Sequence, residues 1–98
     1  MKDEYQSLKL INNTHQQRFE MKVGEGMAMI EYRQSPGKII LIHTEVEPAL
    51  EGRGAATAII EKTLDYIEKN NLKLIPLCPF VLAYIKRHPE WKRIVEVN

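Results

Sequence analysis

The sequence predicts a single α+β domain, 1–98. We expect an antiparallel strand meander, then a helix, a strand parallel to the end of the meander, and a second helix. Short β-prone runs separated by turn residues fill the first half of the chain, the second half changes to helical periodicity, and a glycine-rich turn, "EGRG" at 51–54, stands at the change. The 98 residues, 44% hydrophobic and 28% charged, suffice for one small core.

Four strands are expected before the glycine turn. They cover residues 8–13, 16–23, 27–33 and 38–46. Asn, Gly and Pro-Gly turns separate them, which favours consecutive antiparallel pairing. The last run is apolar at nearly every position through Ile42, which is typical of a central strand covered on both faces.

Helical spacing begins directly after the glycine turn. One face gathers the apolar positions, namely Ala56, Ile59, Ile60, Thr63, Leu64 and Ile67. Asn70 and Asn71 can take the left-handed conformation that ends such a helix. A short strand over 72–77, a helix over 79–87 that Pro89 stops, and a final short strand over 91–97 are expected to follow.

The glycine turn is a candidate anion site. A structural turn needs at most one glycine, so Gly52 and Gly54 together indicate a backbone that a ligand approaches closely. If strands 38–46 and 72–77 are parallel, the turn lies at the carboxyl end of the sheet, where open α/β sheets bind ligands. The dinucleotide fingerprint fails because Thr57 stands at its third glycine, and the Gly-Lys-Ser/Thr of nucleoside-triphosphate loops is absent.

A third motif fits. The segment V-x-P-x-x-x-G-x-G-A-A, 46–56, resembles the pyrophosphate-binding segment of GNAT superfamily N-acetyltransferases, and residues 43–91 are similar to the compact, single-domain GNAT-like proteins. The resemblance implies a GNAT-like fold and acetyl-coenzyme A as cofactor. The pantetheine arm would lie where strands 38–46 and 72–77 separate. The implied cofactor-binding residues are Val46, Gly52, Arg53, Gly54, Ala55 and Ala56.

The sequence departs from the superfamily pattern at several places. Glu51 replaces the usual Gln or Arg at the start of the motif, which puts a negative charge near the diphosphate. The superfamily's "FY-x-K-x-GF" pattern is absent from the second helix. The chain is also too short for the N-terminal helices that build an acceptor pocket in the full-length enzymes.

Four residues are candidates for catalysis. Cys78 follows strand 72–77 and is expected at the mouth of the cleft as a general acid or a transient acyl acceptor; the alternative is a small buried apolar residue. His43 and Glu45 share one face of their strand and could take a proton from an amine, or they are plain surface residues. Tyr84 could protonate a departing thiolate, or it packs in the core. No metal site is predicted.

Two functions fit these features best. The first is an acetyl-coenzyme A-dependent N-acetyltransferase with an unidentified amine acceptor, a small molecule or a protein lysine. The second is a module that binds coenzyme A or acyl-coenzyme A without efficient transfer and acts through a partner protein. A plain structural or interaction domain would leave the double glycine unexplained.

Composition narrows the remaining classes. A net charge of +1 with well-mixed charges argues against a nucleic-acid binder, and no run approaches the roughly 20 apolar residues that span a membrane. The single cysteine fits a reducing compartment, so we expect a cytoplasmic protein. Its small core is compatible with a monomer or a weak homodimer.

Overall fold

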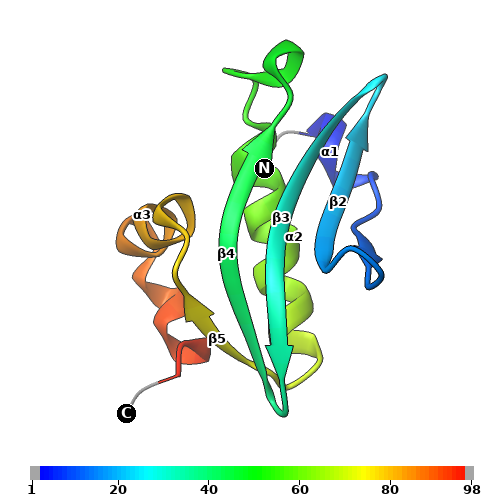
Figure 1. The fold of residues 1–98 in the computed structure, drawn as a ribbon. Helices are drawn as coiled ribbons and strands as arrows, with labels where there is room; N and C mark the ends of the chain where they lie inside the picture. The colour runs from blue at the N-terminus through cyan, green and yellow to red at the C-terminus, as the bar shows by residue number, and fades with distance from the viewer. Residues whose placement is uncertain (1–2, 97–98) are drawn as a thin grey trace.

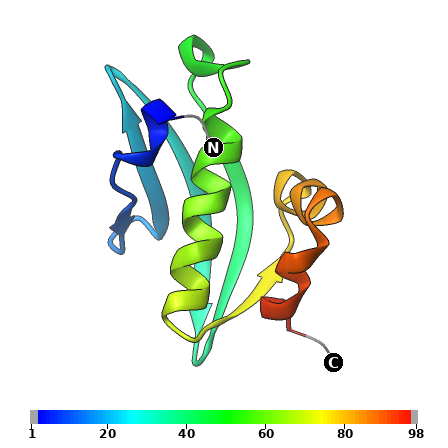
Figure 2. The ribbon, with the colours of Figure 1, turned by 180° about the vertical axis from the view of Figure 1, so that it is seen from behind.

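A computed structural model describes residues 3–96 as one five-stranded sheet with a long helix against one face (Figures 1 and 2). The elements are α1 (Asp3–Gln6), β1 (Ile11–Asn13), β2 (Arg18–Val23), β3 (Gly26–Ser35), β4 (Lys38–Val46), the 3₁₀ helix η1 (Pro48–Leu50), α2 (Ala55–Lys69), β5 (Lys73–Pro76), α3 (Pro79–Arg87) and the 3₁₀ helix η2 (Pro89–Ile94). None of the helices within 3–96 is long and apolar enough to span a membrane.

The strand order confirms the predicted α+β fold. The sheet runs β1-β2-β3-β4-β5, with antiparallel pairing through β4 and a parallel pair between β4 and β5. Two-residue turns join β2 to β3 and β3 to β4, and each holds a glycine with positive φ, Gly24 at 60° and Gly37 at 77°. These tight hairpins fix the register of the meander, and helix α2 makes the connection that a parallel pair requires.

The two ends of the described chain differ from the sequence-based expectation. The first strand is shorter than predicted, Ile11–Asn13, and the short helix α1 precedes it. The strand predicted over 91–97 is wrong: η2 occupies most of it, and Val95 makes a single parallel bridge to Leu74. Pro89 starts η2, and the Arg93 guanidinium holds it against α2 by donating to the Glu68 carboxylate, 2.9 Å from Nη2 to Oε1. Residue 97 lies outside the described residues.

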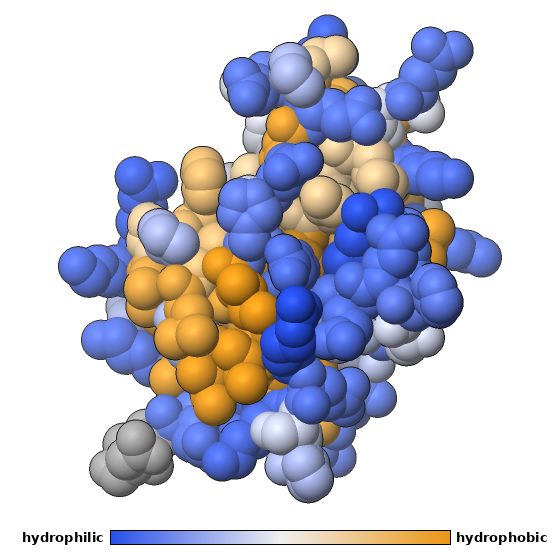
Figure 3. All heavy atoms as spheres, in the orientation of Figure 1, coloured by the Kyte–Doolittle hydropathy of each residue, from blue (hydrophilic) through white to orange (hydrophobic). Residues whose placement is uncertain are grey.

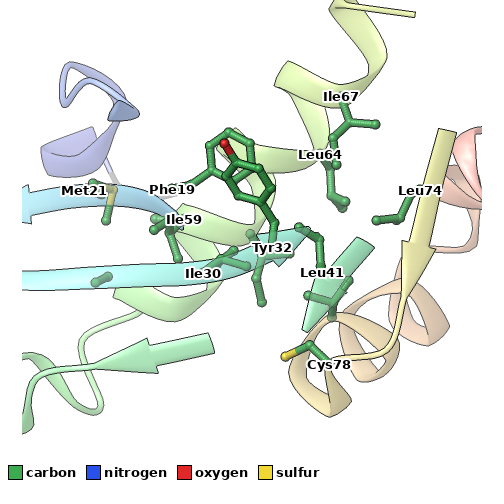
Figure 4. Close-up of a cluster of buried hydrophobic side chains, with 14 of the residues drawn as sticks. Phe19, Met21, Ile30, Tyr32, Leu41, Ile59, Leu64, Ile67, Leu74 and Cys78 are labelled. Atoms are coloured by element: carbon green, nitrogen blue, oxygen red, sulfur yellow. The ribbon is translucent and has the colours of Figure 1, made fainter. Parts of the chain in front are cut away.

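The core lies between the sheet and α2 (Figure 4). Helix α2 buries its predicted face, although Ala55 and Ala58 take the fully buried positions at its start and Ala56 is half-buried. The Phe19 ring lies 4.6 Å from the Tyr32 ring, centroid to centroid. Asn71, with φ 56°, follows the helix in the predicted left-handed conformation.

The opposite face of the sheet is only partly covered. In β4 the buried Ile39 and Leu41 alternate with Ile40 and Ile42, which are half-buried, so the prediction of a strand covered on both faces holds for one face. Figure 3 shows apolar residues gathered on part of this face, which is turned away from α2. Leu77, just after β5, leaves 61% of its surface exposed.

One buried polar group lacks a partner among the described residues. The Thr63 hydroxyl on α2 is fully buried without a hydrogen bond. Replacing a buried, unpaired hydroxyl with a methyl group of similar size removes its desolvation cost. We therefore expect Thr63→Val to stabilise the protein by about 1 kcal/mol, a rise of ~4–8 °C in the Tm of a domain of this size.

Thermal or urea unfolding of the two proteins would check this expectation. Thr63→Ser is the matched control, because it keeps the hydroxyl and removes the buried methyl group; it should lower stability by about 1 kcal/mol. A Val variant that is no more stable than the wild type would contradict the expectation and would mean that the hydroxyl is satisfied in solution.

Candidate functional site

Strands β4 and β5 separate after a short parallel pairing, as the resemblance to GNAT-like proteins implies. The ladder ends at the pair Leu41↔Pro76. The Leu41 carbonyl accepts hydrogen bonds from the amides of both Leu77 and Cys78, at 3.0 and 2.9 Å, and the chain then turns into α3. Strand β4 continues to Val46 with only β3 beside it in the described part of the sheet. A cleft therefore opens between the end of β4 and the start of α3.

A β-bulge orients the side chains at this end of β4. Glu31 of β3 pairs with His43, but its neighbour Tyr32 pairs with Leu41, so Ile42 is an extra residue on β4. The face directed at the core therefore changes from odd to even positions, from Leu41 to Thr44.

His43 and Glu45 consequently share the opposite, exposed face of β4. Their side chains are 57% and 60% exposed, and His43 Nε2 lies 3.4 Å from Glu45 Oε1. The side-by-side placement that strand periodicity predicts is present.

A cavity of about 470 Å³ lies at the end of β4, within the size range of small-molecule sites. The end of β4, η1, the glycine turn, the first turn of α2 and one residue of α3 form its walls. Its lining residues are His43, Thr44, Glu45, Val46, Leu50, Glu51, Gly52, Gly54, Ala55, Ala56, Thr57 and Phe80. Five of the six predicted cofactor-binding residues line this cavity, together with His43 and Glu45.

The glycine turn presents backbone amides to the cavity. Gly52 and Gly54 have φ of 77° and 83°, and Gly54 is the N-cap of α2. Hydrogen bonding within the helix starts where the Ala58 amide donates to the Gly54 carbonyl at 3.0 Å. The amides of residues 54–57 thus precede the helical ladder, and no side chain caps them.

Elementary electrostatics favours an anion at this position. Unpaired amides and the helix macrodipole both attract negative charge at the start of a helix. The glycines and alanines of the turn carry no bulk that would keep a ligand from the backbone. The residues present therefore fit a diphosphate, such as that of coenzyme A. Arg53, the sixth predicted residue, is exposed and is not among the lining residues.

Two long-range contacts, which sequence reasoning missed, hold the glycine turn in place. The buried Tyr5 of α1 donates a hydrogen bond of 2.8 Å from its hydroxyl to the Arg53 carbonyl. A Cβ atom at Gly26 would lie 3.0 Å from Leu50 Cγ, so the start of β3 packs closely under η1. Tyr5 is 48 residues away from Arg53 in sequence, and no local pattern indicates such a contact.

Cys78 is buried, not at the mouth of the cleft. It is the N-cap of α3 and only 1% exposed, and its Sγ lies 3.1 Å from the hydroxyl oxygen of Thr44. Its amide donates to the Leu41 carbonyl at 2.9 Å, which fixes the backbone of Cys78 beside β4. Thr44 also lines the cavity, although it lies on the buried face opposite to His43 and Glu45.

Tyr84 lies in a different hollow, between α2 and the end of α3. Its hydroxyl donates to Glu61 Oε1 at 2.9 Å, and its ring lies 4.4 Å from the His88 ring. Burial and the neighbouring Glu61 carboxylate raise the pKa of Tyr84. The structure therefore does not bring Tyr84 together with the residues that line the cleft.

Removing the Tyr5 hydroxyl tests whether it holds the turn. We expect Tyr5→Phe to lower stability by about 1 kcal/mol and to speed amide hydrogen exchange in residues 51–55. Tyr32→Phe is a matched control, because the Tyr32 hydroxyl donates to Asn12 in the edge strand β1 and not to the glycine turn. Equal exchange in 51–55 for both variants, measured by mass spectrometry, would show that the Tyr5 hydrogen bond does not order the turn.

Comparison with known proteins agrees with this architecture. The sequence is 33% identical over 63 residues to Protein NATD1 of Gallus gallus and of Mus musculus, a segment that covers 63% of this chain and 57% of each relative. Protein NATD1 of Homo sapiens is equally similar, with 56% of its length covered. The match thus spans little more than half of these relatives. The model of the family described as GCN5-related N-acetyl-transferase matches residues 18–94, which include the cleft and the glycine turn. The chain therefore belongs to the GCN5-related N-acetyltransferase family.

Proposed function

We propose that this protein is an acetyl-coenzyme A-dependent N-acetyltransferase that transfers an acetyl group to an amine. One observation carries the proposal. The uncapped start of α2, with amides that precede the helical ladder and with small side chains, lines the same cavity as the separated end of β4. A diphosphate and an extended apolar arm need these two features side by side.

The binding part of the proposal assigns the diphosphate to the amides of Gly52 and of residues 54–57, since the Arg53 amide donates to the Leu50 carbonyl. Arg53 can add a charge-assisted contact from the rim, because its exposed side chain is free to turn toward a bound anion. Glu51 lines the cavity and opposes binding by repulsion. Leu50 and Phe80 supply apolar walls for the pantetheine arm.

The chemical part rests on the end of β4. Acetyl-coenzyme A supplies an acetyl group activated as a thioester. His43 and Glu45 line the cavity 3.4 Å apart and are placed to accept the proton of an amine, directly or through water. The backbone amide of Val46, at the end of the strand, is the proposed hydrogen-bond donor to the acyl oxygen. Cys78 keeps its proposed role as acid or acyl acceptor only if Thr44 moves.

The alternative function is a coenzyme A-binding module that acts through a partner. One observation favours it. The titratable side chains among the cavity-lining residues are His43, Glu45 and Glu51. The two candidates for protonating the departing thiolate do not line the cavity, because Cys78 is buried and Tyr84 lies in another hollow. Titration with acetyl-coenzyme A followed by an assay of thiol release with a panel of amines separates the two functions. Binding with turnover supports the transferase, and binding without turnover supports the module.

Thr57→Glu tests the anion site without damaging the fold. Thr57 is exposed, lines the cavity and lies in the first turn of α2, where a carboxylate favours the helix. A larger residue at Gly54 would instead strain the backbone at φ 83°. We expect Thr57→Glu to weaken coenzyme A binding about fivefold or more at low salt, because it places like charges together, while the Tm stays level or rises.

Calorimetric titration would measure the affinity, with Thr57→Gln as the uncharged control. The Gln variant should bind within about twofold of the wild type, since it adds length but no charge. An unchanged affinity in the Glu variant would exclude the start of α2 as the diphosphate site.

Glu51→Gln should act in the opposite direction. Removing the negative charge from the rim of the cavity is expected to tighten coenzyme A binding about two- to fivefold at low salt, and added salt should shrink the gain. Glu47→Gln, a residue just before η1 that is not among the cavity-lining residues, is the matched control. Weaker binding of the Glu51→Gln protein would contradict the proposed placement of the diphosphate.

A further inference from the structure

Thr44 contacts both Cys78 and the cavity. The thiol is 1% exposed and is not among the cavity-lining residues, whereas Thr44 both lines the cavity and contacts the thiol. The Thr44 hydroxyl oxygen lies 3.1 Å from Cys78 Sγ, and Thr44 itself is 6% exposed. Thr44 is therefore a side chain through which the cavity and the buried sulfur adjoin.

The fold places Thr44 there by two independent features. The bulge at Ile42 turns Thr44, rather than His43, toward the buried side of β4. The two hydrogen bonds to the Leu41 carbonyl, from the amides of Leu77 and Cys78, hold Cys78 beside β4, where its thiol meets Thr44. If Ile42 instead took part in regular pairing, the alternation would continue from Leu41 and turn His43 and Glu45 toward the buried side.

We propose that Thr44 is a positioning residue that controls access from the cavity to the Cys78 thiol. This inference rests on the proposed function, in which the cavity holds acetyl-coenzyme A. The β-branched Thr44 side chain has few favourable χ1 rotamers, and in the observed one its hydroxyl lies against the sulfur. A hydroxyl–thiol contact is only a weak hydrogen bond, so the rotamer restriction, rather than the hydrogen bond, holds the side chain against the thiol.

The two γ-substituents of Thr44 can be removed separately. Thr44→Ser keeps the hydroxyl but removes the β-branch, so its side chain can rotate away from the thiol. Thr44→Val removes the hydroxyl but keeps the β-branch and the shape, so the thiol should stay covered. Both variants retain a residue that a strand accepts.

The test measures alkylation of Cys78 by iodoacetamide in the folded, ligand-free protein, followed by mass spectrometry. We expect slow labelling of the wild type and of Thr44→Val, and labelling about tenfold faster or more in Thr44→Ser, which corresponds to ~1.4 kcal/mol in the free energy of opening. Equal rates in all three proteins, or a Val variant as fast as the Ser variant, would overturn the inference.

A stability control separates access from general loosening. Ile67→Val removes a buried methyl group from α2, near the end of that helix, and should lower stability without speeding the labelling. If Ile67→Val is labelled as fast as Thr44→Ser at equal stability, unfolding rather than access sets the rate, and the inference is wrong.

Coenzyme A added to Thr44→Ser distinguishes this inference from the proposed function. If the cavity holds the cofactor, saturating coenzyme A should slow the fast labelling toward the wild-type rate. Fast labelling that coenzyme A leaves unchanged would support the access role of Thr44 and contradict the cofactor site. If Thr44→Ser is labelled no faster than the wild type but coenzyme A slows its labelling, the cofactor site is supported and the access role of Thr44 is contradicted.

Discussion

The Leu41 carbonyl is the point on which the site depends. By accepting two amides in succession, from Leu77 and Cys78, it ends the parallel ladder and starts the turn into α3. A longer ladder would have paired the end of β4 with β5 and closed the cleft. The sheet is thus continuous where it supports the core and divided where a ligand is proposed to bind.

The proposed anion site is made almost entirely of backbone. The turn over 51–54 contributes amides and glycines, and the tyrosine from α1 supplies its support from the buried side. Fixed backbone dipoles need no rearrangement when an anion binds, so the site does not depend on charged side chains. Because the backbone supplies the polar groups, the apolar side chains of the 98 residues remain available for the core.

Local signals predicted most of the fold. Period-2 and period-3.6 patterns gave the meander and both helices, and α3 begins and ends at the expected residues because prolines mark both positions. The glycine spacing likewise predicted where the cavity lies. The tail was assigned wrongly because "RIVEV" has strand propensity, whereas Pro89 and the Arg93–Glu68 ion pair favour a 3₁₀ helix packed on α2. The inward turn of Cys78 and the Tyr5 contact depend on residues far apart in sequence, which no window of the chain contains.

The bulge at Ile42 makes the position of an insertion or deletion in β4 matter more than the residue type at the bulge. A substitution of Ile42 keeps the bulge, and a deletion of Ile42 removes it while Leu41 and His43 keep their partners Tyr32 and Glu31, so Thr44 stays on the buried face in both cases. A deletion of His43 would instead shift the rest of the strand by one position and bury the Glu45 carboxylate where Thr44 now lies. Relatives that align across this strand with a one-residue gap at Ile42 could therefore keep the same residues at the cleft, whereas a gap one position later would require a different set.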